Sequence, residues 1–228
     1  MKIIIVSDLH LDDDPRRINW LAWIIDQHQP HAVFSLGDNG VNFDHQRFKE
    51  EILGRCRFYS LYGNHEDMKW LTTLWNSDGT PVLLRDGKII ILDGLRLGFI
   101  NGIISQRKRT RKGVPRKTPD EYLKIARKLT RKVDILCIHE FPAPDELAEE
   151  TSLNMPAFIV REAVQHVRPK VVLCGHIHYR RIQPQIYHIG STRIIVIDST
   201  DKYYVLLDVP ERQLELKRDH ETLFTVQI

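Results

Sequence analysis

Five short apolar segments each end in side chains that can bind a metal ion, and this recurrence most constrains the fold. The first, residues 2–7, is rich in β-branched residues and is followed by Asp8 and His10. Such a run is typical of a strand buried on both faces. The other four lead into Asp38, into Asn64 with His65, into His139, and into His176 with His178. Because ligands in open α/β sheets bind at the carboxyl ends of the strands, we expect these side chains to meet there.

Segments with helical spacing separate the first three strand-like runs. The segment that begins at Asp14-Pro15 and ends near Gln29-Pro30 carries apolar side chains at helical intervals and predicts a helix. A second helix is predicted over residues 44–53, between strands at 32–36 and 57–62. The alternation of strand and helix favours a layered α/β fold with right-handed crossovers.

The pattern changes after residue 81. Residues 82–84, 88–92 and 95–100 are predicted to form antiparallel strands, joined by Asp86-Gly87 and Asp93-Gly94 turns. Residues 105–117 lack periodicity and predict a surface loop. The rest of the chain predicts helices after Thr118 and over 156–167, and strands at 133–138, 170–174, 193–197, 202–207, 213–217 and 223–226. Without a repeat or a clear linker, residues 1–228 are interpreted as a single domain.

Composition limits the functional classes. The chain has 228 residues, 42% of them hydrophobic, which is enough for a sizeable core, and a net charge of only +3. Cys56, Cys137 and Cys174 are interpreted as small buried hydrophobes in a reducing compartment. With no signal segment and no membrane-spanning run, a cytoplasmic protein without membrane contact is expected. The oligomeric state stays open.

The types of candidate ligand restrict the ion. Neutral imidazole, carboxylate and one amide oxygen suit Mn²⁺, Fe or Zn²⁺ better than Mg²⁺ or Ca²⁺. Leaving His65 aside, the candidate side chains exceed what one tetrahedral zinc requires and fit two ions that share a carboxylate. They are Asp8, His10, Asp38, Asn64, His139, His176 and His178.

Taken in order, these motifs resemble the motif set of the calcineurin-like metallophosphoesterases. The resemblance runs from residue 8 to residue 178 and implies a four-layer α/β/β/α sandwich, with two mixed β-sheets flanked by helices. It also implies two divalent metal ions, of which Mn is expected and Fe or Zn are alternatives. One ion would be held by Asp8, His10, Asp38 and His178, and the other by Asp38, Asn64, His139 and His176. Asp38 is the implied bridge.

The resemblance implies hydrolysis of a phosphoester substrate. Two ions about 3.5 to 4 Å apart clamp a phosphoryl group and lower the pKa of a shared water toward about 7, so that hydroxide can attack phosphorus. His65, the implied catalytic histidine, would assist the leaving group or the transition-state charge. The interpretation is a phosphodiesterase or nucleotide phosphohydrolase. The alternatives are a nuclease and a non-catalytic interaction module on the same fold.

The sequence departs from the protein Ser/Thr phosphatases of this family after Asp38. Those enzymes carry a second Asp and an Arg there, whereas this chain has Val41, Asn42 and Phe43. Protein phosphatase activity is therefore not expected, and Asp44 and Asp67 are the hypothetical partners of His65.

The nuclease alternative depends on a segment rich in basic residues. Residues 107–117 contain seven cations that can reach an anionic substrate, a nucleotide or a nucleic acid, although a solvated charged surface is the simpler interpretation. They are Arg107, Lys108, Arg109, Arg111, Lys112, Arg116 and Lys117. Arg180 and Arg181, directly after the last motif, are further candidates for phosphate contact.

Overall fold

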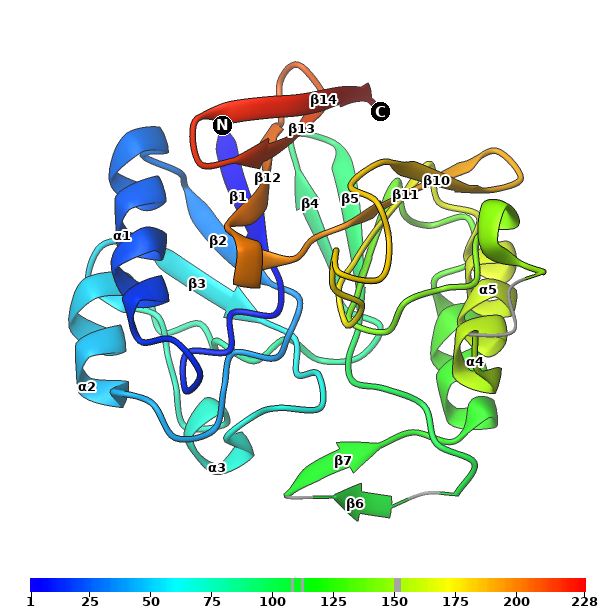
Figure 1. The fold of residues 1–228 in the computed structure, drawn as a ribbon, viewed down its shortest axis with the longest axis horizontal. Coiled ribbons are helices and arrows are strands. Elements are labelled where there is room, and N and C mark those ends of the chain that lie inside the picture. The colour runs from blue at the N-terminus through cyan, green and yellow to red at the C-terminus, as the bar shows by residue number, and fades with distance from the viewer. Residues whose placement is uncertain (108, 112, 150–152) are drawn as a thin grey trace.

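Two six-stranded mixed β-sheets lie face to face between two layers of helices (Figure 1). This computed structural model describes residues 1–107, 109–111, 113–149 and 153–228. The arrangement confirms the α/β/β/α sandwich expected from the sequence.

The first sheet has the strand order β14-β13-β12-β1-β2-β3. Its central strand β1 pairs in parallel with β2 and antiparallel with β12, so the beginning of the chain joins its last quarter. All but the first residue of β1 are buried, as its apolar run predicts. The strands are β1 (Lys2–Val6), β2 (Ala32–Ser35), β3 (Arg57–Ser60), β12 (Tyr203–Asp208), β13 (Gln213–Arg218) and β14 (Glu221–Gln227).

The second sheet has the order β10-β11-β9-β8-β5-β4. Its four inner strands are parallel, and both edge strands run antiparallel to their neighbours. Its strands are β4 (Ile89–Leu92), β5 (Leu95–Ile100), β8 (Ile135–Ile138), β9 (Val171–Cys174), β10 (Ile186–Ile189) and β11 (Thr192–Val196). Asp93 and Gly94, both with positive φ, form the predicted hairpin turn between β4 and β5.

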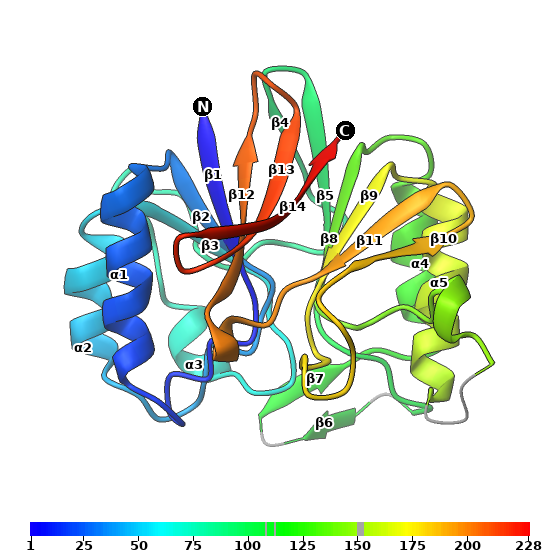
Figure 2. The ribbon, with the colours of Figure 1, turned by 45° about the horizontal axis from the view of Figure 1, so that its top comes forward.

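The helices form the two outer layers (Figure 2). On the first sheet lie α1 (Arg16–His28), α2 (His45–Phe48) with the π-helical turn η1 (Lys49–Leu53), and the short α3 (Met68–Leu71). On the second lie α4 (Pro119–Lys128) and α5 (Met155–Val167). The predicted capping box begins α4, with Thr118 and Glu121 satisfying each other's backbone amides. Two 3₁₀ turns complete the set, η2 (Asp145–Leu147) and η3 (Ser199–Asp201).

Three apolar layers hold these elements together. Ile3 and Ile5 of β1 face the second sheet, whereas Ile4 and Val6 face α1, because successive side chains of a strand alternate. Phe34 and Phe99 stack across the two sheets with ring centroids 5.4 Å apart. A third layer packs α4 and α5 against the second sheet.

Some sequence predictions were wrong. Residues 82–84 form no strand, and only Leu83 makes an isolated bridge, to Ser60. The expected loop at 105–117 contains a hairpin of β6 (Arg109–Arg111) and β7 (Val114–Arg116). Strand β10 (Ile186–Ile189) and helix α3 (Met68–Leu71) were not predicted from the sequence.

Among the described helices, none is both long enough and apolar enough to cross a lipid bilayer.

Candidate metal centre

The ends of four strands bring six of the seven predicted ligands into two clusters. Asp8, His10 and His178 form one, following β1 and β9. Asp38, His139 and His176 form the other, following β2, β8 and β9. Within each cluster one ligand atom per residue lies within 4.8 Å of the others, a spacing that can hold a metal ion.

Asp38 lies between the two clusters. Its Oδ2 is 3.4 Å from Nε2 of His139 and 3.8 Å from Nε2 of His10. Its Oδ1 accepts the backbone N–H groups of Asn64 at 2.5 Å and His65 at 2.7 Å. One oxygen is thus fixed by the backbone, and the other faces imidazoles of both clusters.

The seventh candidate, Asn64, fits the second cluster. In the described part of the chain, Asn64 Oδ1 is buried without a hydrogen-bond partner, which is costly unless something else satisfies it. A Cβ on the neighbouring Gly63 would overlap Asp38 Oδ1 and lie 2.6 Å from His139 Nε2. Carboxylate, imidazole and amide groups are suitable ligands for a divalent cation, and a side chain at position 63 would collide with them.

Groups behind the ligands orient two of the imidazoles. Nδ1 of His139 lies 3.1 Å from the carbonyl oxygen of Leu36, and Nδ1 of His178 lies 3.1 Å from Oδ1 of Asp198. Because both partners can only accept, each Nδ1 carries the proton and leaves Nε2 for an ion. Nε2 of His176 lies 3.4 Å from Oε1 of Glu140.

Sequence analysis missed Asp198 and Glu140. Asp198 is fully buried and also accepts the backbone N–H groups of Tyr179 and Thr200. It follows strand β11 as the predicted ligands follow theirs, and Glu140 directly follows His139. Position at a strand end was therefore a signal for both residues.

Burial and mutual charge shift the pKa values of the cluster. Burial raises the pKa of Asp8 to about 6 and lowers that of His176 to about 3. For His139 burial acts against protonation, but the Asp38 carboxylate prevails and raises the pKa to about 10. The same contact lowers the pKa of Asp38, although burial opposes this. Asp38 and His139 thus form an ion pair within the second cluster, and a cation bound there would change the charge state of both side chains.

Two further buried carboxyls surround the centre. Burial raises the pKa of Glu66 to about 8, with a further contribution from the charge of Asp38, and raises that of Glu140 to about 7. Glu66 accepts hydrogen bonds from both the backbone and the side-chain amide of Asn39. These contacts hold the loops after β2 and β3 together.

The backbone is strained where the ligands leave their strands. Asp8, His10, Asp38 and His176 all have positive φ, between 42° and 67°, which non-glycine residues seldom adopt. The strain is offset by hydrogen bonds between the loops, including Asp8 N–H to Gly37 O and His10 N–H to Asp38 O, both 2.9 Å. Outliers concentrated at one place indicate a functional site.

His65, the predicted catalytic residue, lies beside the first cluster. Its ring centroid is 5.3 Å from that of His10. Within the described residues, its two hypothetical partners are engaged elsewhere: Asp44 caps α2 and Asp67 caps α3. Asp67 also lies 3.8 Å from His45, which stacks on Trp70.

The basic segment is only partly described. Lys108 and Lys112 lie outside the described residues, as do the side chains of Arg109 and Arg111. Arg116 lines a cavity of about 460 Å³ together with Asn64 and His176. Arg180 and Arg181 are exposed after the last motif.

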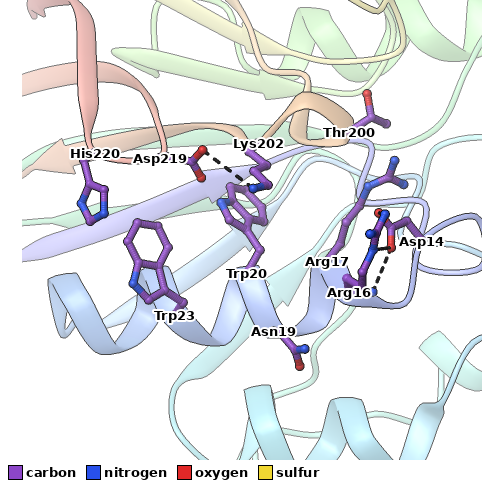
Figure 3. Close-up of a pocket in the computed structure, with 10 residues that line it drawn as sticks. All are labelled: Asp14, Arg16, Arg17, Asn19, Trp20, Trp23, Thr200, Lys202, Asp219 and His220. Carbon is purple, nitrogen blue, oxygen red and sulfur yellow. Dashed lines mark hydrogen bonds and ion pairs between the residues drawn. The ribbon is translucent and has the colours of Figure 1, made fainter.

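A second cavity, of about 700 Å³, lies between α1 and the turn that joins β13 to β14 (Figure 3). Trp20 and Trp23 of α1 line it opposite His220. Two of its lining residues contact the surroundings of the metal centre: Arg17 Nη1 donates to the carbonyl oxygens of Leu9 and His10, and the backbone N–H of Thr200 donates to Asp198.

The comparison with protein families agrees with this geometry. Residues 1–180 match the family described as calcineurin-like phosphoesterase, and they include every predicted ligand. The chain belongs to the calcineurin-like phosphoesterase family. It is therefore a metallophosphoesterase, a hydrolase that acts on phosphoester bonds. No curated protein matched its sequence.

Solved structures similar to this phosphoesterase share its fold at low sequence identity. A structure of TT1561 from Thermus thermophilus is 14% identical, with a TM-score of 0.66 and 96% of this chain and 99% of that chain covered. A dimetal phosphatase from Danio rerio is 10% identical, with a TM-score of 0.61 and coverage of 100% and 98%. An archaeal phosphodiesterase is 15% identical, with a TM-score of 0.52 and coverage of 95% and 99%. At these identities the similarity establishes the fold alone.

Proposed function

We propose that the chain hydrolyses a phosphodiester or a nucleotide phosphoester with two divalent cations. The carrying observation is the position of Asp38, whose Oδ2 faces imidazoles of both clusters. One cation would be held by Asp8, His10, Asp38 and His178, and the other by Asp38, Asn64, His139 and His176. Together the cations would clamp the scissile phosphoryl group and acidify a water molecule.

The side chains around this centre are placed to donate a proton and to orient the metal ligands. His65 lies next to His10 on the side of the first cluster, within reach of a phosphoryl group bound there, and we assign it the proton that the leaving oxygen takes. Asp198 and the Leu36 carbonyl hold His178 and His139 in one tautomer, so that the ligands are oriented before a cation binds.

Metal identity and location belong to the same proposal. Four imidazoles among seven ligands favour manganese, with iron or zinc as alternatives, over magnesium or calcium. A reducing cytoplasm suits the three free cysteines, of which Cys137 and Cys174 are buried in strands.

The test is hydrolysis of bis-p-nitrophenyl phosphate with and without Mn²⁺. We expect stimulation by Mn²⁺, loss in the presence of a chelator, and a fall of about 10³-fold or more in kcat for Asp38→Ala. Asp201→Ala, an acid in turn η3 outside both clusters, is the matched control and should retain activity. Hydrolysis that survives both the chelator and Asp38→Ala would contradict the proposal.

The nuclease alternative depends on the basic hairpin. Arg107→Ala and Arg116→Ala together should weaken oligonucleotide binding and reduce its salt dependence if nucleic acid is the substrate. Unchanged affinity would favour a small phosphoester.

A further inference from the structure

The cavity lined by Arg116 adjoins the second cluster. Asn64 and His176 line it from the metal side, Glu140 lies beside them, and Arg116 faces them from β7 of the hairpin. A group bound in this cavity therefore has both residues of the candidate metal centre and Arg116 among its neighbours. At about 460 Å³ it has room for a substituent of the scissile phosphate.

Lys117 fixes the hairpin so that Arg116 stays at the cavity. The Lys117 ammonium is 2.8 Å from the Tyr62 hydroxyl oxygen, 2.7 Å from the carbonyl oxygen of Asn101 and 3.1 Å from Oδ2 of Asp86. Its backbone pairs with residues 103–105. The ammonium is thus used by the fold and is not available to a substrate.

Neighbouring residues on an extended chain point to opposite sides. Lys117 points into the protein, with its side chain only 9% exposed, and Arg116 lines the cavity. Of the two adjacent cations, Lys117 anchors the hairpin and Arg116 borders the cavity.

The other lining groups select for a small polar ligand. The described side chains around the cavity include amides, a hydroxyl, the buried carboxyl of Glu140 and a few apolar groups, and none of them is aromatic apart from the imidazole of His176 on the metal side. A nucleobase would find no Phe, Tyr or Trp ring to stack on. A guanidinium instead matches a phosphate, which it binds through two parallel N–H···O hydrogen bonds.

We propose that Arg116 binds a second phosphate of the substrate, next to the one that is hydrolysed. This rests on the proposed phosphoesterase function and narrows its substrate to esters with two phosphates, either linked as a diphosphate or separated on one nucleoside. In the hydrolysis one water is consumed. Its hydroxide ends on the attacked phosphorus, the P–O bond to the leaving group breaks, and the leaving oxygen keeps the electron pair and takes the proton.

The kinetic test compares three substrates with Mn²⁺. They are thymidine 5′-p-nitrophenyl phosphate, its 3′-phosphorylated analogue, and diadenosine diphosphate. Arg116→Ala should lower kcat/KM for at least one of the two-phosphate substrates by about 10- to 100-fold more than for the one-phosphate ester, mostly through KM. Which of the two responds identifies a linked or a separate second phosphate.

Arg127→Ala removes the same charge from an exposed position on α4 and should leave the substrate ratios as in the wild type. Arg116→Lys should recover part of the lost preference, because the charge returns without the paired donors. Equal losses on all three substrates, or no loss, would overturn the assignment of Arg116.

A binding measurement separates this inference from the proposed function. Calorimetric titration of the Mn²⁺-loaded protein with AMP, ADP and adenosine 3′,5′-bisphosphate needs no turnover. We expect Arg116→Ala to weaken ADP or the bisphosphate by about 10- to 100-fold more than AMP. If no ester is hydrolysed but this difference is found, the proposed function fails and the Arg116 site stands. If esters are hydrolysed but Arg116→Ala weakens all three ligands equally, the proposed function stands and the Arg116 site fails.

Discussion

At the scale of single residues, the groups that hold the ligands matter as much as the ligands. Asp198 fixes His178 through Nδ1, and its own position is fixed by the N–H groups of Tyr179 and Thr200 and by the hydroxyl of Thr200. The hydrogen bond to this carboxylate raises the pKa of His178. The carboxylate therefore makes the imidazole a more basic and better oriented ligand.

Replacing this carboxylate should weaken one cluster selectively. For Asp198→Asn we expect about 10- to 100-fold weaker Mn²⁺ binding at the cluster of Asp8, His10 and His178, with the other cluster changed much less. Calorimetric titration with Mn²⁺ should then show two separated binding events. Asp201→Asn, in the same turn, should titrate like the wild type, and equal weakening of both events in Asp198→Asn would contradict the orienting role.

The sequence predicted the residues that the structure gathers but missed those that support them. Six of the seven predicted ligands lie in the two clusters and Asn64 lies beside the second, because strand ends in an α/β sheet meet at one edge. The pairing of His178 with Asp198 spans 20 residues and a change of strand. Such pairings depend on tertiary placement, which local periodicity does not encode.

At the scale of elements, the hairpin β6–β7 shows why a charged segment was misinterpreted. Its strands carry arginines and Pro115, residue types that are unusual in strands. The pairing is stabilised from outside, through the ion pair and hydrogen bonds of Lys117 and its bridge to Ile104. Since the ion-pair and hydrogen-bond partners of Lys117 are distant in sequence, no pattern within residues 105–117 indicates a hairpin.

The pairing of β5 with the start of β8 should respond to acid. Arg96 binds Asp134 through Nε and Nη2, both at 3.0 Å, and this contact lowers the pKa of Asp134. A carboxyl whose folded pKa is lowered stabilises the protein above its unfolded pKa of about 3.9 and loses that contribution as the pH falls through the folded value.

Urea unfolding at several pH values measures this. The wild type should be more stable than Asp134→Asn between about pH 5 and 7, and the difference should shrink below about pH 4. Asp93→Asn, in the exposed hairpin turn, should lack this pH dependence. A difference that stays constant down to about pH 3 would exclude the ion pair as its source.

At the scale of the whole molecule, one apolar layer joins the two sheets. Phe99 of the second sheet is fully buried and stacks on Phe34 of the first, which in turn stacks on Tyr59 with centroids 5.2 Å apart. We propose on this basis that residues 1–228 fold as a single domain, since neither sheet can bury its inner face alone.

Removing the Phe99 ring should therefore lower the stability of both sheets together. Phe99→Ala should lower the free energy of unfolding by about 3 to 5 kcal/mol in a single cooperative transition. Phe158→Ala, a partly exposed ring on α5, should change it much less. Two separate transitions in either protein would indicate that the sheets unfold independently.

The position of β1 also determines when the first sheet can be completed during translation. β1 and β2 leave the ribosome before β12, the other neighbour of β1, which begins only at Tyr203. At about 5 to 20 residues per second, the open edge of β1 waits on the order of ten seconds or more. By the end of this interval every candidate ligand has been synthesised, while an apolar strand edge is still open to association with other chains.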